Sequence, residues 1–406
     1  MLALLAGLAL GAECPAEPSL RDPDGEITAL SQNLKFIITG EKRRLRDALF
    51  AEWLRDEGAH VDLLLLSEAR LTGGFAAWEP EWCFYTQLAG DDDAYTWAPI
   101  SAGRPPGGLA LGVRQREAGE ARAVAAYAGR KYRAKPTSLA EGFLGRVFKF
   151  EKGWAGVSIE DTHLVWSHTQ ASYRKDPVKG AGKPGEGRAG QFADLADDLG
   201  RPDRATLLTG DLNLLDGFRP RHAETEARIA AARARDAETM AHFRERTGIN
   251  LAWPWARPPA EGADAATTGA SDAAVAVAPD VMGTFAGDID RRRAADVWDV
   301  GAPYDRVGVN DAFLAQHPGT RVRPVEIARG WLGVSDHLGL EIAIPFGKRA
   351  AAAAPAARAS AAEGGHRCGW EGVGALFARR PAAPPREDAR LAGRAPGHLL
   401  GIAADY

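Results

Sequence analysis

The chain has 406 residues, of which 45% are hydrophobic and 26% are charged, and it is long enough for one large or two ordinary globular domains with a sizeable core. The formal net charge of -4 argues against a protein that holds nucleic acid by bulk positive charge, although an acidic enzyme can still carry a local basic groove. Composition therefore disfavours a general nucleic-acid-binding protein and leaves enzymes open.

Residues 1–12 (MLALLAGLALGA) form an apolar run that is too short to span a bilayer. Small residues and a polar, proline-containing stretch follow it, as they do after an export signal. The sequence therefore predicts an export signal and leader over residues 1–20, and a secreted or periplasmic protein. A plain apolar terminus is the alternative, because the run lacks the basic residues that usually begin such a signal.

The three cysteines, Cys14, Cys83 and Cys368, lie far apart and form no CxxC pair. A structural zinc site is therefore not indicated. Export would permit at most one disulfide among them. The odd count and the scattered positions favour free or buried cysteines.

Predicted strands and amphipathic helices follow one another along most of the chain. In residues 41–57, Leu45, Leu49 and Trp53 recur at helical spacing, which predicts an amphipathic helix. The next run, 61–67, is nearly all apolar and ends at Glu68, as expected for a strand buried on both faces. Further strands are expected at 27–36, 108–113, 154–159, 163–169, 206–213, 303–310 and 338–345, and further helices at 192–199 and 221–246.

The other long segments contain little periodicity. Residues 71–106 are expected to form an irregular aromatic surface loop, 254–280 a mobile insertion, and 347–406 a low-complexity, disordered tail. Residues 26–346 then form one domain of the α/β class. Its strands, helices and long loops predict two packed mixed β-sheets flanked by helices, a four-layer α/β sandwich with polar strand ends at one rim.

The strand that begins at Thr206 runs into Gly-Asp-Leu-Asn. On a strand, Asp211 and Asn213 would project to the same face while Leu212 points into the core, and Gly210 would leave the approach open. A carboxylate beside a carboxamide offers oxygen ligands for a hard divalent cation. An Asx turn after the strand is the alternative.

Polar residues also end most of the other predicted strands. Taken singly, a histidine or aspartate at a strand end is more often a hydrogen-bonded core or turn residue. At successive strand ends, however, such residues together predict a catalytic site. The candidate set is Asn33, Glu68, His168, Asp211, Asn213, Asp305, Asp336 and His337.

Six motifs in chain order, SQNLKF, LLLLSEAR, VWSHTQAS, LLTGDLN, YDRVGVN and VSDHLGLEI, resemble the endonuclease/exonuclease/phosphatase superfamily. The smaller motifs GGLALGV, KGW and RAGQ are similar to those of its neutral sphingomyelinase branch. The resemblance implies a deoxyribonuclease I-like fold, with residues 26–346 as the catalytic domain. It also implies dependence on Mg²⁺ or another divalent cation.

The resemblance further implies roles for the candidate residues. Metal ligands would come from Asn33, Glu68, Asp211, Asn213, Asp336 and His337. Asp211 would orient or deprotonate the attacking water, and Asn213 would bind a phosphoryl oxygen. His337 would act as general acid or base, oriented by Asp305. His168 would stabilise the charge of the phosphorane.

These roles imply a Mg²⁺-dependent hydrolase of phosphodiester bonds, similar to sphingomyelinase or phospholipase C. Because the basic residues are scattered, a lipid headgroup or small molecule is expected as substrate rather than nucleic acid, with peripheral membrane contact and no protein partner. Trp78, Trp82 and Trp97 would suit a choline-like cation or a lipid interface, although anchoring a long loop is the commoner role of such residues. The alternatives are a secreted deoxyribonuclease-like endonuclease and an inactive binding module on the same fold.

Overall fold

The computed structural model describes residues 14–15, 18–22, 25–34, 40–69, 81–89, 95–99, 108–116, 120–137, 152–171, 177–215, 223–251, 304–325, 327, 335 and 337–347. All of these belong to one unit of the chain, Met1–Lys348, and the second unit is Arg349–Tyr406. Residues 1–13 of the predicted export signal, the predicted insertion at 254–280 and the predicted tail beyond residue 347 lie outside the described residues.

One of the two β-sheets has six strands. Their order is β1 (Ser19–Asp22), β7 (Glu120–Lys131), β8 (Gly153–Ile159), β9 (Thr162–His168), β10 (Ala205–Asp211) and β11 (Asp305–Val309). The sheet is mixed, because β9 and β10 run parallel while the other neighbours run antiparallel.

The other sheet has seven strands. Their order is β12 (Arg321–Val325), β13 (Gly339–Pro345), β2 (Glu26–Asn33), β3 (Leu63–Ser67), β6 (Ala110–Arg114), β4 (Trp82–Ala89) and β5 (Tyr95–Pro99). This sheet is also mixed, since β2 and β3 are parallel and the remaining pairs antiparallel.

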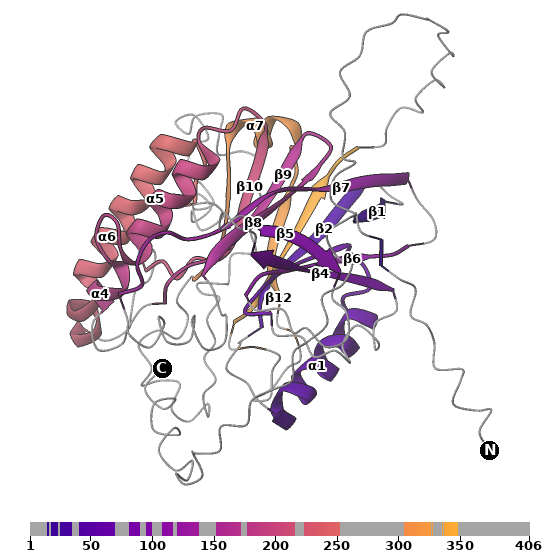
Figure 1. Cartoon of the computed structure of the whole chain (residues 1–406), viewed down its shortest axis with the longest axis horizontal. Coiled ribbons are helices and arrows are strands. Elements are labelled where there is room, and N and C mark those ends of the chain that lie inside the picture. Colours follow the sequence, from indigo (N-terminus) through magenta and orange to yellow (C-terminus); the bar gives the residue numbers. More distant parts are fainter. Residues whose placement is uncertain are drawn as a thin grey trace, which may run out of the picture. The chain divides into compact units, whose positions relative to one another are not determined.

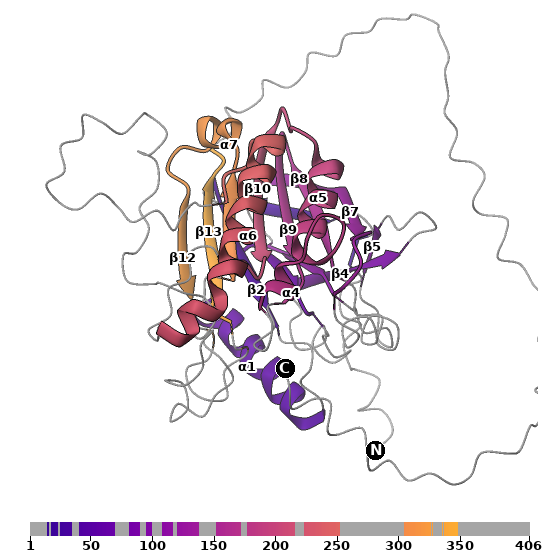
Figure 2. The same ribbon diagram turned by 90° about the vertical axis from the view of Figure 1, so that its left-hand side faces the viewer.

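Successive side chains of a strand point to opposite faces of its sheet, so both faces of each sheet carry apolar side chains. Inward residues such as Ile27 and Leu207 form one core between the sheets. Outward residues such as Leu64 pack under helix α1 (Gly40–Arg55). On the other side of the sandwich, outward residues of β8, β9 and β10 pack under α5 (Gly187–Leu199) and α6 (Ala223–Thr247), and Figures 1 and 2 show these helices on opposite sides of the sheets. The predicted four-layer α/β sandwich is confirmed.

Helix α5 illustrates how the sequence sets these layers. Phe192, Leu195 and Leu199 lie on one face and are buried, and Phe192 meets Phe243 of α6 edge to face at 5.3 Å. Each buried side chain of this size contributes about 1.5–3 kcal/mol. The helix ends at Gly200, whose φ of 59° few other residues adopt readily. Two short helices, α4 (Pro177–Ala181) and α7 (Asp311–Gln316), complete the described set.

The expectation of an irregular loop at 71–106 is wrong for part of that segment, because it contains β4 and β5. The strands β1, β7 and β12 were also not expected. Of these five strands, β1, β5 and β12 are edges of their sheets, and edge strands need no continuous apolar run. The sheet structure therefore begins at Ser19, ahead of the expected domain boundary at residue 26.

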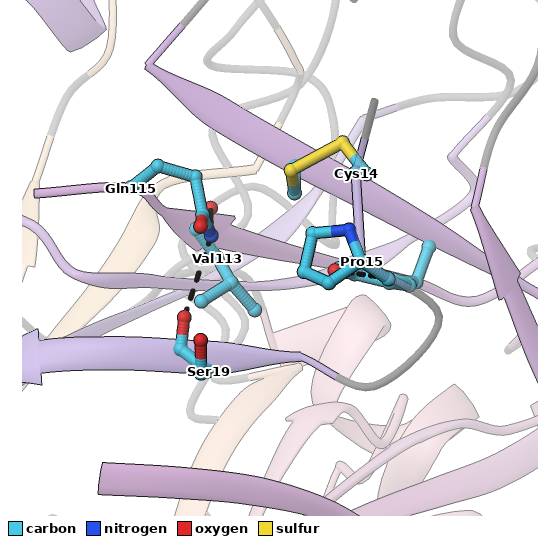
Figure 3. Close-up of a disulfide and its surroundings, with 7 residues drawn as sticks. Cys14, Pro15, Ser19, Val113 and Gln115 are labelled. Carbon is cyan, nitrogen blue, oxygen red and sulfur yellow. Dashed lines mark hydrogen bonds between the residues drawn. A yellow bond between two sulfur atoms is a disulfide. The ribbon is translucent and has the colours of Figure 1, made fainter. Parts of the chain in front are cut away.

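A disulfide fastens the N-terminal segment to the sandwich. Cys14 is bonded to Cys83 of β4, with their Cα atoms 5.4 Å apart, so the expectation of free cysteines is wrong for this pair. The Tyr85 hydroxyl donates to the carbonyl of Pro15 at 3.0 Å, and the Gln115 side chain donates to Ser19 O at 3.4 Å (Figure 3). Because β1 pairs with β7 of the other sheet, the segment that holds Cys14 touches both sheets. Cys368 lies outside the described residues.

Within the described residues, no helix combines the length and the apolar character needed to cross a membrane.

Candidate active site

Polar side chains from both sheets meet at one end of the sandwich, which we call the rim. The parallel strands β2 and β3 end there, as do β9 and β10, and β8 and β11 begin there. Asn33, His168, Asp211 and Asp305 each fall on the inward face of their strand, two or four residues from a core residue. Strand alternation therefore directs all four side chains between the sheets. The rim residues are Asn33, Glu68, Lys152, His168, Asp211, Asn213, Asp305 and His337.

Asp211 lies at the centre of the rim. Its Oδ2 accepts a hydrogen bond from Asn33 Nδ2 at 2.8 Å, which joins the two sheets. The same oxygen is 3.6 Å from His168 Nε2 and 3.9 Å from His337 Nε2. Asp211 is only 2% exposed. A buried carboxylate with a histidine on either side is suited to accept a proton or to share a cation.

Glu68 reaches the rim because the backbone leaves the extended conformation. In a continued strand it would share the outer face with Leu64 and Leu66. Its φ of 51° ends the strand, and Glu68 Oε1 lies 3.3 Å from His168 Nε2. A non-glycine residue in this region costs on the order of 1–3 kcal/mol, and such residues cluster at functional sites.

Asp305 and His337, which are far apart in sequence, form a close pair. His337 Nδ1 lies 2.6 Å from Asp305 Oδ2. A carboxylate at Nδ1 favours the tautomer with the proton on that nitrogen, and Nε2 lies 3.9 Å from Asp211 Oδ2. The backbone of His337 is fixed too, since its N–H donates to Ser335 Oγ at 3.1 Å and its carbonyl accepts from Gln32 Nε2 at 3.3 Å. The pair therefore has the geometry of an imidazole held in one tautomer by a carboxylate.

Asn213 lies beside Asp211 for a different reason from the expected one. The strand β10 ends at Asp211, so Asn213 does not share a strand face with it, and its φ is 51°. Its N–H donates to Asp211 Oδ1 at 3.2 Å, and its Nδ2 donates to Thr169 O at 3.1 Å.

Gly210 also differs from expectation. A Cβ there would lie 2.2 Å from Ser167 O, so this glycine permits β9 and β10 to pack closely.

A buried ion pair between α5 and α6 contacts the two segments that follow the rim ends of β9 and β10. Arg188 of α5 and Asp236 of α6 are fully buried, 2.7 Å apart. Arg188 also donates to the carbonyl of Gln170, just after β9, at 3.2 Å. Asp236 accepts from the N–H of Leu215, just after β10, at 3.0 Å. The pair therefore ties both helices to the segments that follow His168 and Asp211. Sequence reasoning noted Arg188 only within the RAGQ motif and missed Asp236.

The rim differs from the predicted set of site residues at two positions, Asp336 and Lys152. Asp336 lies outside the described residues, so its place in the site stays a prediction. Lys152, which sequence reasoning quoted only within the KGW motif, lies at the rim with Nζ 2.5 Å from His168 Nε2. Lys152 reaches the rim because it directly precedes β8, which pairs with the strand of His168.

Two groups of rim residues could hold a metal ion. In Glu68, His168 and Asp211 the candidate ligand atoms all lie within 4.8 Å of one another, and the same holds for Asp211, Asp305 and His337. Carboxylate oxygens are the ligands that Mg²⁺ prefers. Asn33, whose Nδ2 donates to Asp211, also carries an amide oxygen, a group that can serve as a ligand to such a cation. The chemistry of the donors therefore fits a hard divalent cation.

The chain was compared with known proteins. No protein-family model and no curated protein matches it. Solved structures similar to it over most of its length include sphingomyelinase C from Streptomyces griseocarneus, with 17% identity and a TM-score of 0.42 over 78% of this chain and 99% of that one. Beta toxin 275-280 from Staphylococcus aureus has 13% identity and a TM-score of 0.46 over 78% and 99%. D. rerio TDP2 complexed with single strand DNA product has 13% identity and a TM-score of 0.43 over 79% and 99%.

These proteins are members of the endonuclease/exonuclease/phosphatase superfamily, which the six sequence motifs resemble. At such identities and TM-scores the similarity carries no information on the substrate. Function has to be inferred from the rim itself.

Proposed function

We propose that the chain is a divalent-metal-dependent hydrolase of phosphodiesters. The observation that carries this proposal is the arrangement around Asp211 Oδ2, which lies 3.6 Å from His168 Nε2 and 3.9 Å from His337 Nε2. One histidine adjoins the carboxylate of Glu68 and the other is held by the carboxylate of Asp305. A candidate cation site and an oriented imidazole thus share one buried aspartate.

Glu68 and Asn33 would hold the cation, with Asp211 within reach. A bound divalent cation would polarise a phosphoryl oxygen and offset the charge that develops on it. Asp211 would orient the attacking water and take up its proton. His337, protonated at Nε2, would give that proton to the leaving oxygen, while Asp305 holds the proton on Nδ1 and so keeps the imidazole oriented. Asn213 would hold a phosphoryl oxygen next to Asp211.

The substrate is proposed to be a small or lipid phosphodiester. Binding of a nucleic acid requires several basic side chains directed at phosphates, but the described arginines of residues 114–133 all pair with carboxylates of the protein. Arg116 pairs with Asp62 at 2.9 Å, Arg130 with Asp198 at 3.5 Å, and Arg133 with Asp194 at 3.3 Å. Arg114 is buried, and Arg174 and Lys175 lie outside the described residues.

Trp82 does not contribute to an aromatic binding surface. It is buried and stacks under Arg114, whose guanidinium carbon lies 4.7 Å from the ring centroid. Trp82 also pairs with Arg114 at the end of β6 that lies away from the rim. The side chains of Trp78 and Trp97 lie outside the described residues. A role for those two in headgroup binding stays a prediction.

The protein is further proposed to be exported. The Cys14–Cys83 disulfide supports this, because disulfides persist in oxidising compartments and are rare in the cytosol. Since Cys14 is joined to β4, removal of a signal would have to occur before Cys14. Mass spectrometry of the non-reduced protein from its natural source should find the cross-linked Cys14–Cys83 peptides. A chain that retains residues 1–13 and carries free thiols at both Cys14 and Cys83 would contradict export.

The function is tested by a substrate panel of sphingomyelin, phosphatidylcholine, duplex DNA and a phosphomonoester, each with Mg²⁺ and with EDTA, at two salt concentrations. We expect release of phosphocholine that depends on Mg²⁺. Efficient cleavage of DNA that falls steeply with salt, without release of phosphocholine, would favour a secreted nuclease. No hydrolysis of any substrate would favour an inactive binding module.

A further inference from the structure

We propose that Lys152 is a catalytic residue whose ammonium group binds a non-bridging phosphoryl oxygen of the substrate. This inference rests on the proposed function, because it assigns a further residue to the same site. It gives Lys152 the charge-stabilising role that the sequence resemblance implied for His168.

The backbone places Lys152 at the rim. It directly precedes β8, and the first residue of that strand, Gly153, pairs with His168. The carbonyl of Lys152 accepts a hydrogen bond from the N–H of Tyr132 at 3.2 Å, which fixes the start of the side chain. From there Nζ reaches to 2.5 Å from His168 Nε2. The ammonium therefore lies at the cluster of catalytic candidates and is held there by its neighbours.

The charges around Lys152 explain why a cation is needed at this position. The rim gathers the carboxylates of Glu68, Asp211 and Asp305, and the first two lie 3.3 Å and 3.6 Å from the same His168 nitrogen that Lys152 contacts. A phosphodiester anion would be repelled by this group of carboxylates. A bound divalent cation offsets part of the repulsion, and the ammonium of Lys152 adds a positive charge on the side of His168.

Burial also favours Lys152 over His168 as the group that meets the substrate. His168 is only 1% exposed, whereas Lys152 is half-buried. Lysine has three N–H donors on a flexible stem, so the ammonium can contact a phosphoryl oxygen while it stays near the imidazole. His168 then acts as a positioning residue that holds Lys152 close to Glu68 and Asp211.

The first arm of the test measures hydrolysis of bis(4-nitrophenyl) phosphate at saturating Mg²⁺ and fixed ionic strength. Lys152→Met should lower kcat/KM by about 10²–10³-fold, the usual effect of removing one donor to a developing oxyanion, and most of the loss should fall on kcat. Lys152→Arg should recover at least about tenfold, because it restores the charge. The matched control is Lys131→Met, which removes an exposed charge at the residue that pairs with Gly153 from the other side. It should stay within about twofold of the parent.

The second arm measures binding of inorganic phosphate by calorimetry in EDTA, without turnover. Lys152→Met should weaken binding at least about fivefold relative to the parent and to Lys131→Met, and Lys152→Arg should bind like the parent. Melting temperatures show which variants are folded. If Lys152→Met does not fold, Lys152→Gln replaces it and Lys152→Arg still reports on the charge.

The two arms separate this inference from the proposed function. If the parent hydrolyses no phosphodiester but binds phosphate, and Lys152→Met binds it more weakly, the proposed function is refuted and the inference is kept. A parent that hydrolyses the diester while Lys152→Met behaves like Lys131→Met in both arms would overturn the inference alone. A parent that neither hydrolyses nor binds phosphate would overturn both.

Discussion

The two ends of the sandwich handle buried charged side chains differently. At the rim the carboxylates of Asp211 and Asp305 are buried on the inward faces of their strands. At the opposite end, which we call the far end, the buried charged residues include Arg114, Arg122 and Asp62. Each arginine there meets oxygen atoms of the protein and lies over an aromatic ring. The two ends thus treat buried charge in different ways.

The far end satisfies its arginines fully. Arg122 lies 2.5 Å from Glu160 Oε1, donates to the carbonyl of Gly347 at 3.0 Å and stands 5.3 Å over the ring of Phe346. Arg114 has a carboxylate partner in Glu81 at 3.1 Å. It also donates to the carbonyl oxygens of Leu54, Gly58 and Val61.

The rim instead gathers carboxylates around two histidines. A buried carboxylate close to others is costly unless a cation joins them. The far end therefore uses its charges to hold the fold, whereas the rim keeps an arrangement that favours ligand binding over stability. Substitutions at the rim should therefore lower kcat more than stability, and substitutions at the far end should lower stability more than kcat.

The largest effect is expected at Glu68. Glu68→Gln should lower Mg²⁺-dependent kcat by about 10³-fold, because a carboxylate ligand of the proposed cation is lost and metal-ion catalysis is worth several kcal/mol. The melting temperature in EDTA should stay the same or rise. Steady-state kinetics and thermal unfolding check this, with Glu81→Gln at the far end as the control. Equal activity of Glu68→Gln and the parent would exclude Glu68 from the site.

Arg114 should show the reverse behaviour. Arg114→Met should lower the free energy of unfolding by about 3 kcal/mol, because buried carbonyl oxygens lose their donor, while kcat per folded molecule stays at the parent value. Urea unfolding measures the first quantity and saturating kinetics the second. The exposed Arg321→Met should cost less than about 1 kcal/mol. A fall in kcat for Arg114→Met with unchanged stability would contradict a purely structural role of Arg114.

Asp305→Asn sharpens the assignment within the rim. The amide no longer holds His337 in the required tautomer, so kcat should fall by about 10²-fold while KM changes little. Initial rates over a range of substrate concentrations separate the two constants. A rise in KM at constant kcat would show that Asp305 contributes to binding instead.

The smallest effect concerns pH and the far end. His317 is buried there, with Nε2 2.7 Å from Thr162 Oγ1 and Nδ1 2.8 Å from the carbonyl of Pro345. Burial lowers the pKa of His317 below its usual value of 6.5, and the hydrogen bond to Pro345 and the charge of Glu160 only partly oppose this. The neutral form is favoured by folding, so this stabilisation is complete above pH 6.5 and is lost as the pH falls below it.

One such group gives a slope of at most about 1.4 kcal/mol per pH unit. Urea unfolding between pH 5 and pH 8 should therefore show stability falling toward acid, less steeply in His317→Gln. The control is His242→Gln on the exposed face of α6, which should keep the slope of the parent. The same slope in His317→Gln would mean that another group, such as His163, whose pKa is also lowered by burial, causes the fall.

Much of the rim could be predicted from the sequence because it lies at the ends of strands buried on both faces. Such strands are recognisable as continuous apolar runs, and the polar residue that ends each run stands out. This is why Glu68, His168 and Asp211 were found, and why the central strands were expected close to their observed positions. The roles of these residues stay predictions.

The rest depends on tertiary contacts that leave weak local signals. The strand β7, EARAVAAYAGRK, is rich in alanine and contains few large apolar residues. The Cys14–Cys83 pair joins residues 69 apart and depends on where the N-terminal segment lies. Lys152 resembles any surface lysine until β8 and β9 pair. The positive φ of Glu68 is likewise set by the surrounding structure, because glutamate seldom adopts that conformation, whereas Asn213 belongs to a residue type that adopts it more readily.

The most direct test of the account is a titration of thermal unfolding with Mg²⁺ in the parent and in Glu68→Gln. A cation that binds only the folded rim stabilises it by RT ln(1 + [L]/Kd), or about 2.7 kcal/mol at a hundredfold excess over Kd. The account predicts that the melting temperature of the parent rises with Mg²⁺ and that Glu68→Gln shows little or no rise. Equal rises in both proteins, or no rise in the parent, would contradict a cation site at the rim.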